Sequence, residues 1–150
     1  MTFDEATQTM EQLGTEQNRK IYKRHGAGDQ VFGVSFANQY ALQKKIKCDQ
    51  ALSDKLWATG NSDAPVLSLL IADPSQFDFN KLNQRLSGLN YYTLVDMLVN
   101  NIAAKAPCAR EALKAWMASD DEWIGSAGYG LLSALLLEGA SFGDEELFGI

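Results

Sequence analysis

The sequence has 150 residues, of which 46% are hydrophobic and 21% are charged, proportions that are ordinary for a soluble globular protein of one domain. No apolar run reaches the roughly 18 residues of a membrane span, and the acidic, polar first ten residues are not typical of a secretory signal. The formal net charge of −6 argues at first against a nucleic-acid ligand. We therefore expect a single domain over residues 1–150, located in the cytoplasm.

Helix signals follow one another along the chain, and no alternating apolar and polar run of five or more residues indicates a strand. The predicted helices cover residues 3–13, 15–26, 35–47, 49–60, 63–73, 77–86, 90–102, 107–118 and 121–138. Residue types that cap helix starts open several of them: Thr15, Ser35, Asp49 and Asp63. Within 35–47, Phe36 and Tyr40 follow the i, i+4 spacing of one helix face, which Gln43 or Lys44 continues.

The segment 90–102, NYYTLVDMLVNNI, carries two stripes when it is drawn as a helix. Apolar side chains recur on one face, which we expect to lie in the core: Tyr91, Leu94, Val95, Leu98, Val99 and Ile102. A second stripe holds Tyr92, Asp96 and Asn100 and points away from the middle of that face. Spacing alone favours an ordinary solvated carboxylate beside a tyrosine that covers core, because positioned carboxylates are a minority of all carboxylates.

Basic residues gather in two short clusters, although the chain as a whole is acidic. Residues 1–60 hold 8 Lys/Arg and 7 Asp/Glu, whereas residues 61–150 hold 5 and 12. The clusters are Arg19-Lys20 with Lys23-Arg24, and Lys44-Lys45 with Lys47. Such runs are usually solvated faces, but two of them also suffice for a local phosphate-facing patch on an acidic protein.

The junctions between helices recur at intervals of about 28 and 32 residues. Each has a small hydroxyl residue before a turn, in ATGN (58–61), LSGL (86–89) and ASDD (118–121). This interval is short for typical HEAT units but fits compact helical pairs, which stack to bury a shared core and form a concave surface. The register of the junctions favours an all-α solenoid of stacked antiparallel helix pairs over a plain helical bundle.

Residues for metal or nucleophilic chemistry are sparse. Cys48 and Cys108 lie far apart with no CxxC, and His25 is the single histidine. Zinc sites and Cys–His dyads need such groups in clusters. We therefore expect no metal, no other cofactor and reduced thiols.

Several segments resemble the AlkD-like DNA alkylation repair proteins, which are all-helical, HEAT-like repeat DNA glycosylases. The run FGVSFANQYALQKKIKCDQALSDKLWATGNSDAPVLSLLIADP is similar to their N-terminal half, with Gly-Val before a helix, a Leu-Trp-x-[ST]-Gly turn and a Leu-Ile-Ala-Asp-Pro ending. NYYTLVDMLVNNI resembles their helix with an aromatic residue four before an aspartate. WMASDDEWIGSAGYGLL resembles their Trp-x-x-Ser-x-x-x-Trp helix pair, and GDEELF the start of the next helix. The resemblance covers roughly residues 10–148.

The resemblance also assigns roles to individual residues. It places the family's catalytic aspartate at Asp96 and its DNA-contacting aromatic residue at Tyr92, where the family has tryptophan. The family's arginine near the lesion falls on Ser126, three residues after Trp123. The residues we expect to contact DNA are Tyr91, Trp123, Ser126, Lys44, Lys45 and Lys47. The family continues through further repeats that supply another aromatic contact, and we expect this chain to lack them after Ile150.

The chemistry implied by the resemblance is hydrolysis of the N-glycosidic bond of N3- or N7-alkylated purines. Cleavage leaves an oxocarbenium-like sugar, which a nearby carboxylate such as Asp96 stabilises. In this family aromatic side chains pack against the DNA backbone and the lesion stays stacked, unlike in glycosylases that flip the base. Tyr92 offers such a ring, whereas Ser126 cannot neutralise a phosphate, and phosphate contacts position a protein on DNA.

We therefore expect a protein that binds duplex or alkylated DNA and in which glycosylase activity is an open question. The alternative is a catalytically inactive helical-repeat interaction scaffold. The acidic second half and Ser126 favour that alternative, whereas the basic clusters and Asp96 favour the DNA-binding function.

Overall fold

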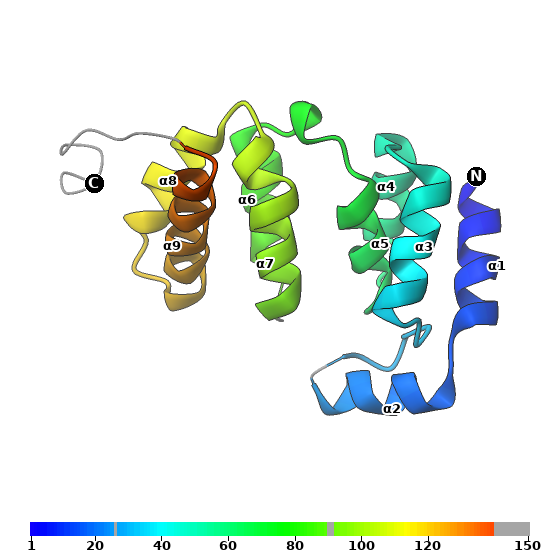
Figure 1. The fold of residues 1–150 in the computed structure, drawn as a ribbon. Coiled ribbons are helices and arrows are strands. Elements are labelled where there is room, and N and C mark those ends of the chain that lie inside the picture. The colour runs from blue at the N-terminus through cyan, green and yellow to red at the C-terminus, as the bar shows by residue number, and fades with distance from the viewer. Residues whose placement is uncertain (26, 90–91, 140–150) are drawn as a thin grey trace. The chain divides into compact units, whose positions relative to one another are not determined.

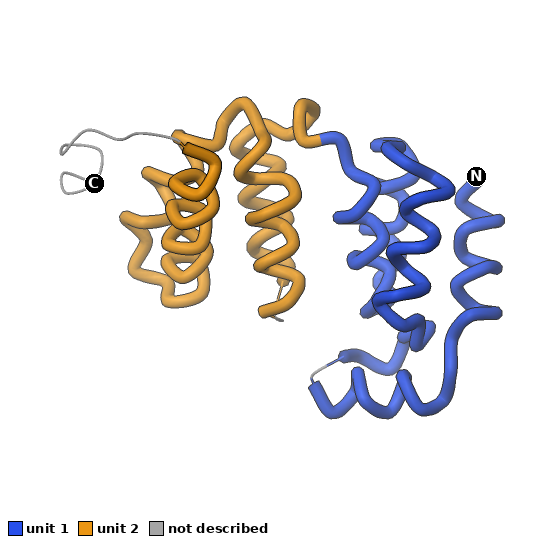
Figure 2. The backbone as a smooth tube through the Cα atoms, in the orientation of Figure 1, with its two compact units in different colours: residues 1–73 blue, residues 74–150 orange. Residues whose placement is uncertain are grey.

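The structure of the chain is a computed structural model, in which residues 1–25, 27–89 and 92–139 are placed. Every regular element in those ranges is helical, which confirms the predicted all-α class. The chain divides into two compact units, Met1–Asp73 and Pro74–Ile150 (Figure 2). The predicted single-domain organisation stays a prediction. Among the placed residues, no helix has the length and apolarity of a membrane span.

Unit 1 contains five helices: α1 (Phe3–Leu13), α2 (Glu16–Arg24), α3 (Phe36–Ile46), α4 (Gln50–Trp57) and α5 (Ala64–Ile71). Three of their starts lie where the capping residues predicted them. The side chain of Thr15 accepts from the backbone N–H of Asn18, and Ser35 and Asp49 make the same i, i+3 bond at α3 and α4. Each of these bonds satisfies a backbone donor that the first turn of a helix leaves unpaired.

The core of unit 1 lies between α1, α3, α4 and α5. It is built from small and branched apolar side chains, each 4% exposed or less: Ala6, Met10, Val34, Leu42, Leu52, Leu56, Leu67 and Ile71. The helices α4 and α5 also approach through a buried pair of hydroxyls. Ser53 Oγ donates to the Ser68 carbonyl at 2.6 Å, and Ser68 Oγ donates to the Ser53 carbonyl at 2.7 Å. Both hydroxyls are thereby satisfied inside the unit, as buried polar groups require.

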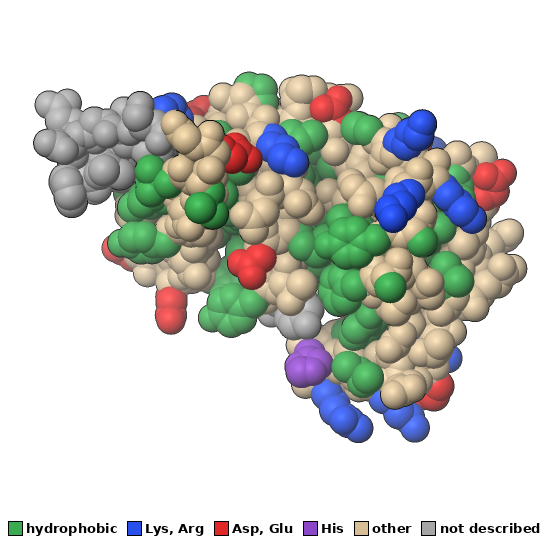
Figure 3. Space-filling model, viewed as in Figure 1, with side chains coloured by type: hydrophobic (Ala, Val, Ile, Leu, Met, Phe, Trp, Pro, Cys, Tyr) green, Lys and Arg blue, Asp and Glu red, His purple; other side chains and the backbone are tan. Residues whose placement is uncertain are grey.

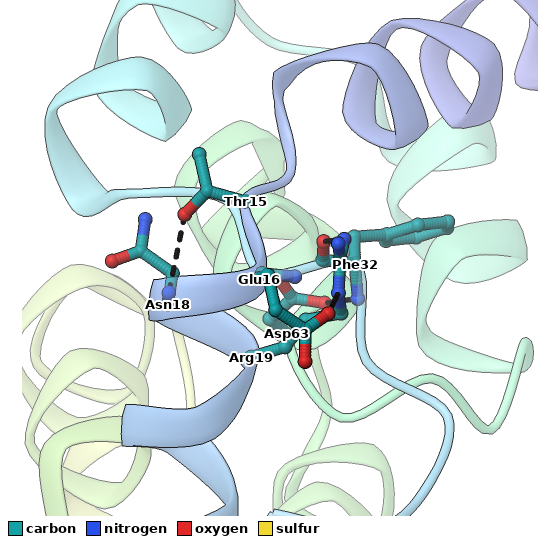
Figure 4. A network of polar contacts seen from close by, with 7 residues as sticks. Thr15, Glu16, Asn18, Arg19, Phe32 and Asp63 are labelled. Carbon is teal, nitrogen blue, oxygen red and sulfur yellow. Dashed lines mark hydrogen bonds and ion pairs between the residues drawn. The ribbon is translucent and has the colours of Figure 1, made fainter.

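The loop between α2 and α3 is held by Asp63, which is only 4% exposed. Its carboxylate accepts from the backbone N–H groups of Phe32, Gly33 and Val34 at 2.9 to 3.0 Å. The prediction that Asp63 caps α5 was therefore wrong, because the residue stands at the N-cap position but its side chain binds the loop instead. Arg19 completes this network by donating to the Phe32 carbonyl at 3.0 Å (Figure 4).

The described residues of unit 2 form two 3-10 turns and four helices: η1 (Pro74–Gln76), α6 (Phe79–Ser87), α7 (Tyr92–Asn101), η2 (Ala103–Lys105), α8 (Ala109–Met117) and α9 (Glu122–Leu137) (Figure 1). The predicted helices at 77 and 107 begin two residues later than expected. Asp78 caps α6, and Cys108 is the N-cap of α8. The 3-10 turns were not predicted, since a three-residue turn has no periodic apolar pattern.

The helices α8 and α9 cross closely at Gly128. A Cβ atom at this position would lie 2.8 Å from the backbone nitrogen of Met117 and 3.0 Å from the carbonyl carbon of Trp116. Close helix approach therefore accounts for one of the three glycines of α9, Gly128. At Gly125 and Gly130 the nearest atoms would be 3.8 Å away, which is ordinary contact.

Candidate nucleic-acid interface

Both stripes predicted for the helix at 90–102 are present in α7. The apolar stripe is buried, at 7% exposure or less: Leu94, Val95, Leu98, Val99 and Ile102. Tyr92, Asp96 and Asn100 all lie on the solvent side. Tyr91, which was assigned both to the core face and to DNA contact, lies outside the described residues. The second stripe is therefore available to a ligand.

Tyr92 is paired with Trp123 across the contact between α7 and α9. The two ring centroids are 4.3 Å apart and the ring planes are inclined by 48°. Tyr92 remains 61% exposed, whereas Trp123 is half-buried. The indole Nε1 of Trp123 is buried and has no hydrogen-bond partner among the described residues. Trp123 thus acts mainly as the support on which the exposed ring of Tyr92 rests.

Asp96 lies one turn after Tyr92 on the same face of α7. Its carboxylate is exposed and makes no hydrogen bond or ion pair within the placed parts of the chain. Ser126 is also exposed, one turn after Trp123 on α9. The arrangement therefore offers a ligand one aromatic ring, one carboxylate and one small hydroxyl.

The electrostatics of this surface are acidic. Neither α7 nor α9 contains a lysine or an arginine. The start of α9 adds two exposed carboxylates, Asp121 and Glu122. A phosphate close to Asp96 would thus meet negative charge and no cation supplied by these two helices. This matches the expectation drawn from Ser126, where the resembled family has arginine.

The lysines expected to contact DNA belong to the other unit. Lys44 and Lys45 lie in the last turn of α3, and Lys47 is its C-cap residue. All three are exposed, and none makes an ion pair or hydrogen bond through its side chain with a described residue. Lys and Arg side chains gather over the end of α3 in the space-filling view (Figure 3). Their charges are therefore available to an external anion.

The other basic cluster is divided between structure and surface. Arg19 is a structural residue, because its guanidinium bonds Glu16 at 3.2 Å and the Phe32 carbonyl at 3.0 Å. Lys20, Lys23 and Arg24 are exposed on α2. The cluster therefore supplies three cations to solvent instead of the four that the sequence indicated.

The stripe of Phe36, Tyr40 and Lys44 on α3 runs from a half-buried residue into solvent. Phe36 is half-buried, Tyr40 is 47% exposed and Lys44 is exposed. For metals, the described residues contain no group of three or more His, Cys, Asp or Glu side chains able to hold an ion.

Comparison with known proteins gives a family and a fold. The model of a family described as DNA alkylation repair enzyme matches residues 6–137. A solved structure is described as coming from a new family of proteins related to the HEAT-like repeat DNA glycosylases with affinity for branched DNA structures. It matches with a TM-score of 0.81 and 35% identity over 91% of this chain. The match covers 58% of that protein's length.

The curated proteins give no match. The all-α, HEAT-like class that the resemblance implied is confirmed by the solved structure.

Proposed function

The chain belongs to the DNA alkylation repair family, and on this premise we propose that it binds DNA, with branched DNA as its preferred form. The preference is suggested by the structural relative, which is described as having affinity for branched DNA structures. The proposal rests on two clusters of exposed cations on unit 1. Their side chains have no hydrogen-bond or ion-pair partner among the described residues: Lys20, Lys23, Arg24, Lys44, Lys45 and Lys47.

These cations suit a phosphate ligand better than an internal role. A lysine that stabilises a fold through an ion pair has a carboxylate within reach, and none of these has one among the described residues. DNA binding releases counterions for every phosphate that such a side chain neutralises. The proposal therefore requires an affinity that falls steeply as salt is added, in spite of the net charge of −6.

The experiment compares a labelled four-way junction with a linear duplex of the same sequences by fluorescence anisotropy over a range of salt. We expect tighter binding to the junction. A variant with Lys44→Gln, Lys45→Gln and Lys47→Gln should bind both forms more weakly, and its salt slope should be smaller by about 1 for each phosphate that is no longer neutralised. Lys55→Gln is the matched control, because Lys55 is an exposed lysine on α4 of the same unit. No binding by the parent at low salt would overturn the proposal.

A second candidate function is hydrolysis of the N-glycosidic bond of alkylated purines. It is favoured by Asp96, whose exposed carboxylate lies one turn from the supported ring of Tyr92. A carboxylate beside a developing oxocarbenium ion provides charge that is already in place when the bond breaks. Release of free base from duplex DNA containing N7-methylguanine tests it directly. The alternative to both functions is an inactive interaction scaffold, which the acidic surface of α7 and α9 favours.

A further inference from the structure

The ring of Tyr40 on α3 is exposed and has no partner of its own. Its exposure is 47%, and its hydroxyl makes no hydrogen bond within the described residues. Tyr22, by contrast, packs edge-on against Phe36 and donates to the Val34 carbonyl at 2.6 Å. Tyr92 rests on Trp123. Tyr40 is therefore an aromatic side chain of unit 1 that the packing of the unit does not explain.

The surroundings of Tyr40 combine small side chains with positive charge. Ala37 and Ala41, both exposed, flank it on the solvent side of α3, so neighbouring side chains leave the ring open. Lys44 lies one turn further along the same face, with Lys45 and Lys47 beside the helix end. No described cation lies over the Tyr40 ring itself, whereas Lys81 lies 4.8 Å from the centroid of Phe77.

We propose that Tyr40 is a stacking platform for an unpaired DNA base, with Lys44, Lys45 and Lys47 binding the phosphates that follow it. Binding of single-stranded nucleic acid combines these two elements, a cationic track for the backbone and an aromatic face for the bases. Every base has a π-face, so the site is selective for unpaired bases but not for sequence. It rests on the proposed DNA-binding function and deepens it, since branched forms such as forks and flaps carry unpaired bases beside the branch, which a linear duplex lacks.

Tyr129 provides the internal comparison. It is 64% exposed on α9, but its helix carries no lysine or arginine. An exposed tyrosine without adjacent cations has no means of holding the DNA backbone beside its ring. The proposal therefore assigns base stacking to Tyr40 and not to Tyr129, although the two residues have the same chemistry and similar exposure.

The test measures binding of Tyr40 variants to a short single-stranded oligothymidylate, a forked duplex with single-stranded arms and a linear duplex. Tyr40→Ala should weaken binding to the single strand roughly tenfold, as expected when one base can no longer stack. Tyr40→Phe should retain the affinity because it keeps the ring, and Tyr40→Leu should not. Tyr129→Ala is the matched control and should bind like the parent. Quenching of a 2-aminopurine base in the strand should disappear in Tyr40→Ala.

Three results would overturn the proposal and each has a different meaning. Equal losses of single-strand and duplex binding in Tyr40→Ala would make Tyr40 a residue that binds the DNA backbone. Binding to the fork and to the single strand that is unchanged in Tyr40→Ala, with retained salt dependence, would remove the stacking platform and leave the proposed function standing. Absence of DNA binding in the parent would remove both. Circular dichroism of each variant establishes that a weaker affinity does not come from unfolding, which is not expected at an exposed position.

Discussion

Tyr92 and Trp123 form an aromatic contact between the two helices of the candidate site, with ring centroids 4.3 Å apart. Because Tyr92 is the first residue of α7 and is 61% exposed, its side chain would otherwise be free to change rotamer. The half-buried indole of Trp123 restrains the side chain of Tyr92, so that one face of the Tyr92 ring stays exposed to solvent. A ring held in this way loses less conformational entropy when a ligand packs against it.

The coupling between these two rings can be measured. A double-mutant cycle of Tyr92→Ala and Trp123→Ala, followed by urea unfolding, should give an interaction free energy of about 0.5–1.5 kcal/mol, the range for aromatic pairs. Trp123→Phe should retain part of it. Effects of the two single changes that add without any coupling would show that Trp123 does not hold Tyr92.

Ser126→Arg tests whether a missing cation limits the Asp96 site. The new guanidinium should bind a phosphate, raise DNA affinity and increase the salt slope by about 1. If Asp96 stabilises the sugar cation, the same change should raise release of free base from N7-methylguanine DNA above that of the parent. Adding Asp96→Asn should abolish the gain in excision while leaving DNA binding nearly intact.

The stability of Ser126→Arg gives the control for that experiment. Ser126 is exposed, so the change should alter the free energy of unfolding by no more than about 0.5 kcal/mol. Tighter DNA binding without any release of base would mean that Asp96 is a surface carboxylate. Excision would then be dropped as a function of this chain.

Gly128→Ala should destabilise unit 2. Its Cβ would lie 2.8 Å from the backbone nitrogen of Met117, which cannot move without shifting α8. We expect the free energy of unfolding to fall by about 1–3 kcal/mol. Gly125→Ala, in the same helix but with 3.8 Å of space, should instead gain up to about 1 kcal/mol from helix propensity. Thermal or urea unfolding of the two variants distinguishes them, and equal effects would contradict the close crossing.

Asp63→Ala should destabilise unit 1 by roughly 3 kcal/mol, because it leaves three backbone N–H groups of the α2–α3 loop without an acceptor. Asp121→Ala is the comparison, since Asp121 accepts only from Ile124 at an exposed N-cap. That change should cost about 1 kcal/mol. Similar destabilisation of the two variants, measured by urea unfolding, would show that the loop keeps its bonds without Asp63.

The cysteines should react slowly near neutral pH. Burial raises the pKa of Cys48, and the carboxylates of Asp73 and Asp49 raise it further. Burial also raises the pKa of Cys108, with a smaller opposing effect from a backbone hydrogen bond. A raised pKa leaves less thiolate at a given pH, so alkylation by iodoacetamide should be slower than for a model thiol and should accelerate as the pH rises. The Cys48→Ser and Cys108→Ser variants separate the two rates, and a rate independent of pH would contradict this account.

The sequence predicted most of what depends on local pattern and missed what depends on distant contacts. Thr15 and Ser35 marked helix starts correctly because capping is decided within four residues. Asp63 has the same side chain type as a cap, yet its partners are 29 to 31 residues away and cannot be read from spacing. The exposure of Tyr40 could not be predicted for a related reason, since spacing does not tell which face of α3 meets its neighbours.

The family resemblance indicated candidate site residues that residue spacing alone did not. The spacing of Tyr92 and Asp96 alone favoured a solvated helix face, and the exposure of both residues agrees with that reading as well as with a ligand site. The support that Trp123 gives to Tyr92 connects two helices that are some thirty residues apart in the chain. No local rule relates positions at that distance, so the contact could be found only in the structure.

The bonds of Asp63 also bear on the order in which the chain folds. While the protein is being synthesised, the N–H groups of residues 32–34 donate to water until their native acceptor, Asp63, has left the ribosome. By then α3 and α4 have already been synthesised. The α2–α3 loop, which precedes them in the sequence, therefore acquires its hydrogen bonds to Asp63 only after they are present. Contacts across this distance carry a loop-closure cost before they are rewarded. Unit 1 is accordingly expected to fold in one late, cooperative step during translation, and not helix by helix.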